Sequence, residues 1–326
     1  HKEGLLLEIQ ANSSIVVDNV FGGCRMAAVR PLISGTLESD NFVESSPSDI
    51  QLEGYNFPAG LSARVLVRGG DINNVYGGND ISGDVTGGNA VGIYASVRGD
   101  VYGGGNGSYA YTDNAALKDN DEYRDFYYDP GSSSVDALNA FRPNAEAVSI
   151  RVMGTEAKPT IIGGAIYCGG NSATLRSVGS NKRATAQLKI GSYVIADKVF
   201  LGNNGENLVT DEILERYGGT VSVGGQNYDF STMDLTNSGQ FDKYMDGVAM
   251  MIEPEVVFDS DDIENAKPED QRDYTKTYKA YSTQFGSFYC GGNVGSMKIN
   301  GTFNVSFNDK VVIYDKVVGG SNIANV

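Results

Sequence analysis

The chain has 326 residues, a formal net charge of −16, 42 glycines, 8 prolines and no tryptophan. A hydrophobic content of 40% argues against disorder, and the glycine content is typical of a fold with many tight corners. The acidic balance disfavours nucleic acids and anionic membrane surfaces as partners, because both would be repelled. No run approaches the roughly 18 apolar residues of a membrane span, so we expect no membrane insertion.

A phrase of two apolar residues, glycines and asparagine recurs along the chain. It reads VFGGCR at 20–25, VYGGN at 75–79, VYGGGN at 101–106, IYCGGN at 166–171, VFLGNN at 199–204, FYCGGN at 288–293 and VVGGSN at 317–322. The three shortest intervals between these phrases are 26, 29 and 33 residues. Intervals of this length are typical of one coil of a solenoid.

Short runs of branched and aromatic residues, bracketed by glycine, predict β-strands at 63–69, 147–154, 220–225 and 302–318. Because strands return once per phrase with little helix between them, we predict an all-β fold. Its expected form is a right-handed single-stranded parallel β-helix, a solenoid domain spanning 1–326. Both ends lie in repeat patterns without a polar cap, so we expect a fragment of a longer solenoid or ends that stack on a partner.

Three polar insertions, at about 107–146, 206–249 and 259–284, interrupt the repeats. The first is rich in tyrosine and the last is highly charged. Short helices are expected within the second insertion at 208–217 and near its end at 239–250. Loops usually carry the function of such folds, so we expect binding contacts on these insertions.

Asparagine follows the glycines in six copies of the phrase. We expect the glycines to adopt backbone conformations closed to other residues, and asparagine to tolerate left-handed geometry. Stacked about 4.8 Å apart, the amides would also form a hydrogen-bonded ladder, so the role predicted for them is structural. These turn residues are Asn79, Asn106, Asn171, Asn204, Asn293 and Asn322.

The second position of the phrase is aromatic in six of seven copies, which predicts a column of rings. A column facing inward would belong to the core, and the apolar first position favours this interpretation. A column facing outward would offer platforms for sugar rings. On that condition alone, the ligand-binding candidates are Tyr76, Tyr102, Tyr167 and Tyr289.

Asp71, Asp84 and Asp100 each follow glycine and precede isoleucine or valine, with Arg68 and Arg98 at matching points upstream. If neighbouring coils are in register, Asp71 and Asp100 stack, and such carboxylates would act as acid and base or hold a cation. The favoured interpretation is a polar corner repeated by duplication. We therefore assign no catalytic residue and keep these five as a weak alternative.

No cofactor is expected. The acid-rich segments 119–125 and 259–273 are candidates for calcium binding, but neither has the Asp-x-Asp-x-Asp-Gly spacing of a dedicated loop. Cys168 and Cys290 share the third position of the phrase with small or apolar residues, which indicates buried thiols. With His1 as the only histidine, thiol catalysis is disfavoured.

The phrases VYGGGN, IYCGGN, FYCGGN and VVGGSN resemble the GGGN-type repeats of large secreted or surface-anchored parallel β-helix proteins of gut Bacteroidetes. They are also similar to autotransporter passengers and, more loosely, to the pectate-lyase-like superfamily with its internal asparagine ladders. The resemblance implies an extracellular or cell-surface location, with glycans or host surface proteins as partners. It carries over no catalytic residue.

The first hypothesis is a non-enzymatic adhesin or glycan-binding scaffold. One alternative is a polysaccharide lyase or glycoside hydrolase that uses carboxylates on a parallel β face. The other is a structural segment of a longer surface rod, which would stack end to end or otherwise self-associate.

Overall fold

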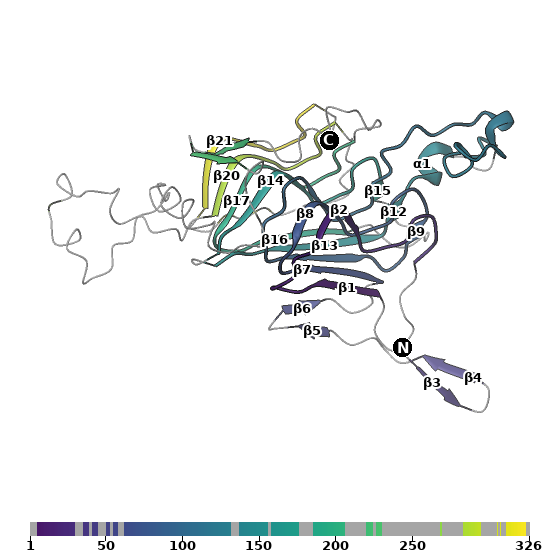
Figure 1. The fold of residues 1–326 in the computed structure, drawn as a ribbon, viewed down its shortest axis with the longest axis horizontal. Helices are drawn as coiled ribbons and strands as arrows, with labels where there is room; N and C mark the ends of the chain where they lie inside the picture. Colours follow the sequence, from purple (N-terminus) through teal and green to yellow (C-terminus); the bar gives the residue numbers. More distant parts are fainter. Residues whose placement is uncertain are drawn as a thin grey trace.

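The computed structural model describes the residues drawn in colour in Figure 1. They are 5–29, 62–131, 137–155, 158–175, 185–205, 283–294 and 311–323, with the single residues 268, 305 and 307 and three antiparallel hairpins. The hairpins join β3 (Gly35–Glu38) to β4 (Asn41–Glu44), β5 (Ile50–Leu52) to β6 (Tyr55–Phe57), and β18 (Thr220–Val223) to β19 (Gln226–Asp229). Nearly all regular structure in these ranges is β-strand, as predicted.

Three parallel sheets dominate the structure, and we call them sheets A, B and C (Figure 1). Sheet A has the order β1 (Leu5–Ile9), β7 (Ala63–Val67), β10 (Asn89–Ile93), β13 (Ala147–Val152), β16 (Thr185–Ile190). Sheet B has the order β2 (Val16–Phe21), β8 (Asp71–Tyr76), β11 (Val101–Tyr102), β14 (Thr160–Tyr167), β17 (Val194–Phe200), β20 (Thr283–Tyr289), β21 (Val311–Val318). Sheet C has the order β15 (Thr174–Leu175), β12 (Asn144–Ala145), β9 (Asp84–Val85).

From β1 to β17 the chain visits sheets A, B and C repeatedly in that order, and we call one such visit a passage. In the first passage Val29 takes the place of a sheet C strand and bridges Val85 of β9. The registers set each phrase beside the phrase of the next passage, so that Val75, Val101 and Ile166 align. The recurring phrase is therefore the repeat unit of sheet B.

The main core lies between sheets A and B and consists of branched aliphatic side chains. Val65 and Val91 of sheet A and Val75 and Val101 of sheet B are all fully buried. Strands β7 and β10 are buried along their whole length, including the polar side chains of Arg64 and Asn89. Burial of each such side chain stabilises the fold by about 1.5–3 kcal/mol.

The glycines of the phrase serve close packing rather than unusual backbone geometry, which corrects the prediction made for them. Among the described glycines, positive φ occurs at Gly70, Gly83, Gly87, Gly88, Gly107 and Gly205, none of which lies within a phrase. A Cβ on Gly77 would instead stand 2.3 Å from the carbonyl oxygen of Gly103 and 2.7 Å from Val91 Cγ2. Gly107 and Gly205 directly follow phrase asparagines, so left-handed geometry occurs one residue later than expected.

The first insertion contains a 3-10 turn, η1 (Ala115–Leu117), and a short helix, α1 (Ala137–Phe141), and projects from the sheets in Figure 1. The helices predicted at 208–217 and 239–250 lie outside the described residues, as does nearly all of the charged segment 259–281. The strand expected at 220–225 is present as β18.

Candidate functional site

The aromatic residues at the second position of the phrase form a buried column. Tyr76 lies between Val75, which is in the main core, and Gly77, whose missing Cβ would point at the core, so its ring lies on the opposite side of sheet B. There it belongs to a separate cluster with Tyr102, Tyr167, Phe200 and Tyr289. Neighbouring rings stack with centroids 4.6 to 4.9 Å apart and planes within 10°.

The column thus faces away from the main core, which corrects the favoured inward interpretation, but it is buried and so does not form a row of sugar platforms. Tyr76, Tyr102, Tyr167 and Tyr289 are only 1 to 4% exposed, and the faces of the rings are covered by one another. The Tyr102 hydroxyl donates to Asp100 Oδ2 at 2.9 Å, which satisfies its polar end. The rings are placed as packing residues rather than as ligand contacts.

Asp71 and Asp100 do not stack, which corrects the expectation drawn from their similar neighbours. Strand β11 pairs with β8 so that Val101 lies beside Val75, and the Asp100 N–H donates to Asn74 Oδ1. Asp71 lies three residues before Asn74 and forms an ion pair with Arg98. The two strands align by the apolar residues of the phrase, and this register leaves Asp71 three residues away from the position beside Asp100.

The remaining members of the proposed carboxylate cluster are equally dispersed. Arg68 is paired with Glu8 at 3.0 Å, and its guanidinium lies 5.1 Å from the centre of the Tyr94 ring. Asp84 lies in sheet C, where it accepts a hydrogen bond from Asn144. These contacts satisfy the charged side chains one by one and do not form a shared site.

The phrase asparagines form a ladder of side-chain amides. Asn322 donates to Asn293, and the chain continues through Asn204, Asn171 and Asn106, with distances from 2.8 to 3.1 Å. The last donor, Asn106 Nδ2, bonds to Asp80 Oδ1 at 3.0 Å. An aspartate, rather than the expected Asn79, thus accepts the last bond of the ladder.

Asn79 lies one residue too early to join the ladder, because its copy of the phrase is one glycine shorter. Its Oδ1 accepts from the Cys24 N–H, and its Nδ2 donates to the carbonyls of Ala27 and Ser82. It therefore joins its turn to the preceding passage, which is still a structural role.

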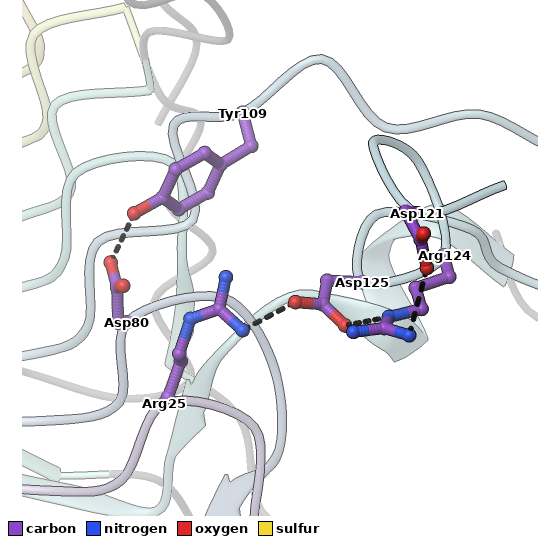
Figure 2. Close-up of polar contacts among 6 residues, drawn as sticks. All are labelled: Arg25, Asp80, Tyr109, Asp121, Arg124 and Asp125. Carbon is purple, nitrogen blue, oxygen red and sulfur yellow. Dashed lines mark hydrogen bonds and ion pairs between the residues drawn. The ribbon is translucent and has the colours of Figure 1, made fainter.

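Asp80 is also the point at which the first insertion contacts the sheets, and Figure 2 shows the contacts. We call the described residues 107–131 and 137–142 the lobe, and Arg25, Asp80, Tyr109 and Asp125 the junction site. The Tyr109 hydroxyl donates to Asp80, and Arg25, from the first passage, forms an ion pair with Asp125 of the lobe. The lobe belongs to the third passage, so the junction site joins three successive passages.

The lobe is held in place by its own small aromatic cluster. Tyr109 stacks on Phe126 with centroids 5.0 Å apart, and Phe141 of α1 meets Tyr111 edge-on at 5.7 Å. The Tyr111 hydroxyl donates to the Ile81 carbonyl at 2.6 Å, next to Asp80. These rings are only partly buried, because the lobe is too small to enclose them.

Electrostatics keep Tyr109 and Arg25 each in one protonation state near neutral pH. Burial, followed by the hydrogen bond to Asp80, raises the pKa of Tyr109 well above its usual value near 10. The hydrogen bond to Asp125 raises the pKa of Arg25 further. Tyr109 therefore remains a neutral donor and Arg25 remains a cation.

The junction site also has unused hydrogen-bonding capacity. Asp80 accepts both of its side-chain bonds through Oδ1, and within the described residues Oδ2 has no hydrogen bond. Arg25 donates to Asp125 through Nη1 alone, and 59% of its side chain is exposed. In the part of the chain that the structure describes, an acceptor and several donors thus remain available on paired segments, since the Asp80 N–H donates to the Cys24 carbonyl and the Ile81 N–H to the Arg25 carbonyl.

Sequence reasoning did not find this site. Its members come from three separate stretches of the chain, and the lobe brings them together by contacting the two earlier passages. One signal was present: with VYGGND aligned to VYGGGN, Asp80 occupies the position of Asn106.

No protein-family model matches the chain, and no match was found among curated proteins or solved structures. In the described ranges no group of three or more His, Cys, Asp or Glu side chains is placed to hold a metal ion. Among the helices in those ranges, none has the length and apolar character needed to cross a membrane.

Proposed function

We propose that the chain is a non-enzymatic, secreted or cell-surface binding module that contacts glycans at the junction site. The observation that carries the proposal is the exposed Arg25 guanidinium near an Asp80 carboxylate with one unengaged oxygen. Sugar hydroxyls both donate and accept hydrogen bonds, and planar arginine and aspartate groups complement them. The partly buried rings of Tyr109 and Phe126 add apolar surface beside these groups.

We also propose that sheets A, B and C close into a right-handed parallel β-helix, as in the gut Bacteroidetes surface proteins that the phrases resemble. The repeated order of the sheets supports this architecture. The isolated bridges from Val29 to Val85 and from Val97 to Ile162 support it further, because they extend the pairing between passages beyond the strands. A crystal structure is the test, and an open or left-handed arrangement would overturn the proposal.

The binding proposal is tested on a glycan array and a panel of host matrix proteins, with the wild-type chain beside two variants. Arg25→Gln removes the cation of the junction site, and we expect it to lose the glycans that the wild type retains. Arg124→Gln is the matched control, because Arg124 is 60% exposed and pairs with Asp121 and Asp125 without contacting Asp80. Absence of wild-type binding to every glycan and matrix protein would refute the proposal.

A further inference from the structure

Counting only partners among the described residues, the junction site presents one open acceptor and several open donors on two segments that are hydrogen-bonded to each other. The open acceptor is Asp80 Oδ2, and the donors are the guanidinium N–H groups of Arg25 that do not contact Asp125. The charge of Asp80 acts on Arg25, and Figure 2 shows the guanidinium between the two carboxylates. A ligand must therefore donate to one group and accept from the group beside it.

Two adjacent hydroxyls of a sugar ring meet this requirement, because each hydroxyl is both donor and acceptor. A carboxylate or sulfate group can accept a hydrogen bond but cannot donate one, so it meets only one of the two requirements. Such an anion would accept from Arg25, but it has no hydrogen to donate to Asp80 Oδ2 and would face a like charge.

The surrounding charges also favour an uncharged ligand over an anionic one. Asp80, Arg25, Asp125, Arg124 and Asp121 form a row of alternating sign, in which Arg25 and Arg124 already have carboxylate partners. The row ends in a carboxylate at both sides, and the whole chain carries a net charge of −16. An anionic ligand would have to compete with Asp125 for Arg25 within a negative field.

We infer that the junction site selects adjacent hydroxyls of an uncharged sugar and rejects sugars that carry carboxylate or sulfate groups. The inference rests on the proposed function, since it specifies the ligand of the same site. Asp80 accepts from one hydroxyl, Arg25 donates to the next, and Asp125 holds the guanidinium in position.

Calorimetric titration of the full chain with neutral hexose oligosaccharides and with uronic-acid oligosaccharides of the same linkage tests the inference. We expect the neutral series to bind at least about tenfold more tightly, since a charge-assisted hydrogen bond is worth about that much. Equal or tighter binding of the uronic-acid series would overturn the inference and leave the proposed function intact. If neither series binds and the glycan array is also silent, the proposed function itself fails.

Two variants connect the selectivity to named groups. Arg25→Gln alters an exposed side chain outside the ladder, and we expect about tenfold weaker binding of the neutral series. Asp80→Asn removes the charge that opposes an anion, so the preference for neutral over uronic-acid sugars should shrink. Asp121→Asn is the control, because it also removes one negative charge, but at the end of the row far from Asp80. The preference for neutral over uronic-acid sugars should stay unchanged in this variant. An undiminished preference in Asp80→Asn, with circular dichroism like that of the wild type, would contradict the assignment.

Discussion

Gly103 and Gly319 occupy the same third position of the phrase, but only Gly103 is packed against neighbouring strands. A Cβ on Gly103 would stand 2.5 Å from the Cys168 carbonyl oxygen and 2.6 Å from Val148 Cγ1, whereas ordinary contact begins near 3.4 Å. A Cβ on Gly319 would meet no atom within 4 Å. Neither glycine has a positive φ, so alanine is compatible with the backbone at both positions.

We expect Gly103→Ala to lower the free energy of unfolding by about 1–3 kcal/mol. The upper part of this range applies because the nearest atom is the backbone carbonyl oxygen of Cys168, directly after β14, and it cannot rotate away as a side chain would. Gly319→Ala should instead be neutral or stabilise the chain by up to about 1 kcal/mol, since it restricts the unfolded chain without a clash.

Urea titrations followed by far-ultraviolet circular dichroism measure the two effects as midpoints relative to the wild type. Because repeat proteins can unfold in parts, the slopes of the transitions should be compared as well. A Gly103→Ala midpoint equal to that of Gly319→Ala would refute the close-packing explanation of the phrase glycines.

Three further predictions concern buried polar groups and use the same titrations or a thiol assay. Asn171→Ala leaves a donor and an acceptor of the ladder without partners and should lower the free energy of unfolding by about 2–5 kcal/mol. Asn322→Ala, at the exposed end of the ladder, should lower it by less than about 1 kcal/mol. Equal losses of stability in the two variants would contradict the ladder. Burial raises the pKa of the Cys168 thiol to about 12. Near pH 8 a disulfide reagent should therefore label the half-buried Cys24 but not the buried Cys168. Labelling of both thiols in the folded protein would contradict the structure. Tyr102→Phe leaves a buried carboxylate oxygen without its hydroxyl donor and should cost about 1–3 kcal/mol, and an unchanged midpoint would show that the hydrogen bond is dispensable.

The sequence predicts the strands well where side-chain patterns and glycine brackets coincide. The runs at 63–69 and 147–154 are β7 and β13, and the recurring phrase marks sheet B in each passage. These predictions succeed because strand formation depends on the local order of branched residues. Why a glycine occupies a given position is harder to predict from the sequence, because close packing and left-handed backbone geometry both select glycine.

Relations across the sheet are harder to predict than the strands. Arg68 and Arg98 have similar neighbours, yet they do not pair with each other. The Arg98 N–H donates to the carbonyl of Ile72, and the Tyr94 N–H donates to the carbonyl of Val67, the residue before Arg68. The stretch from Arg68 to the phrase at Val75 is four residues longer than the stretch from Arg98 to the phrase at Val101. The strands align by the apolar residues of the phrase, so the two arginines fall out of register. A match between polar residues therefore does not establish that they lie together.

The position of the junction site follows from the direction of the ladder. Every amide N–H between Asn322 and Asn106 points toward Asp80, so the amide dipoles add and favour a negative charge at that end. Asp80 supplies this charge and accepts from the ladder and from the lobe through the same oxygen, so that no described residue donates to the other oxygen. The repeat thus holds the carboxylate rigidly from one side, while the Tyr109 hydroxyl holds it from the other. A ligand that binds there meets a group whose orientation is already set, so binding requires little further ordering of the protein.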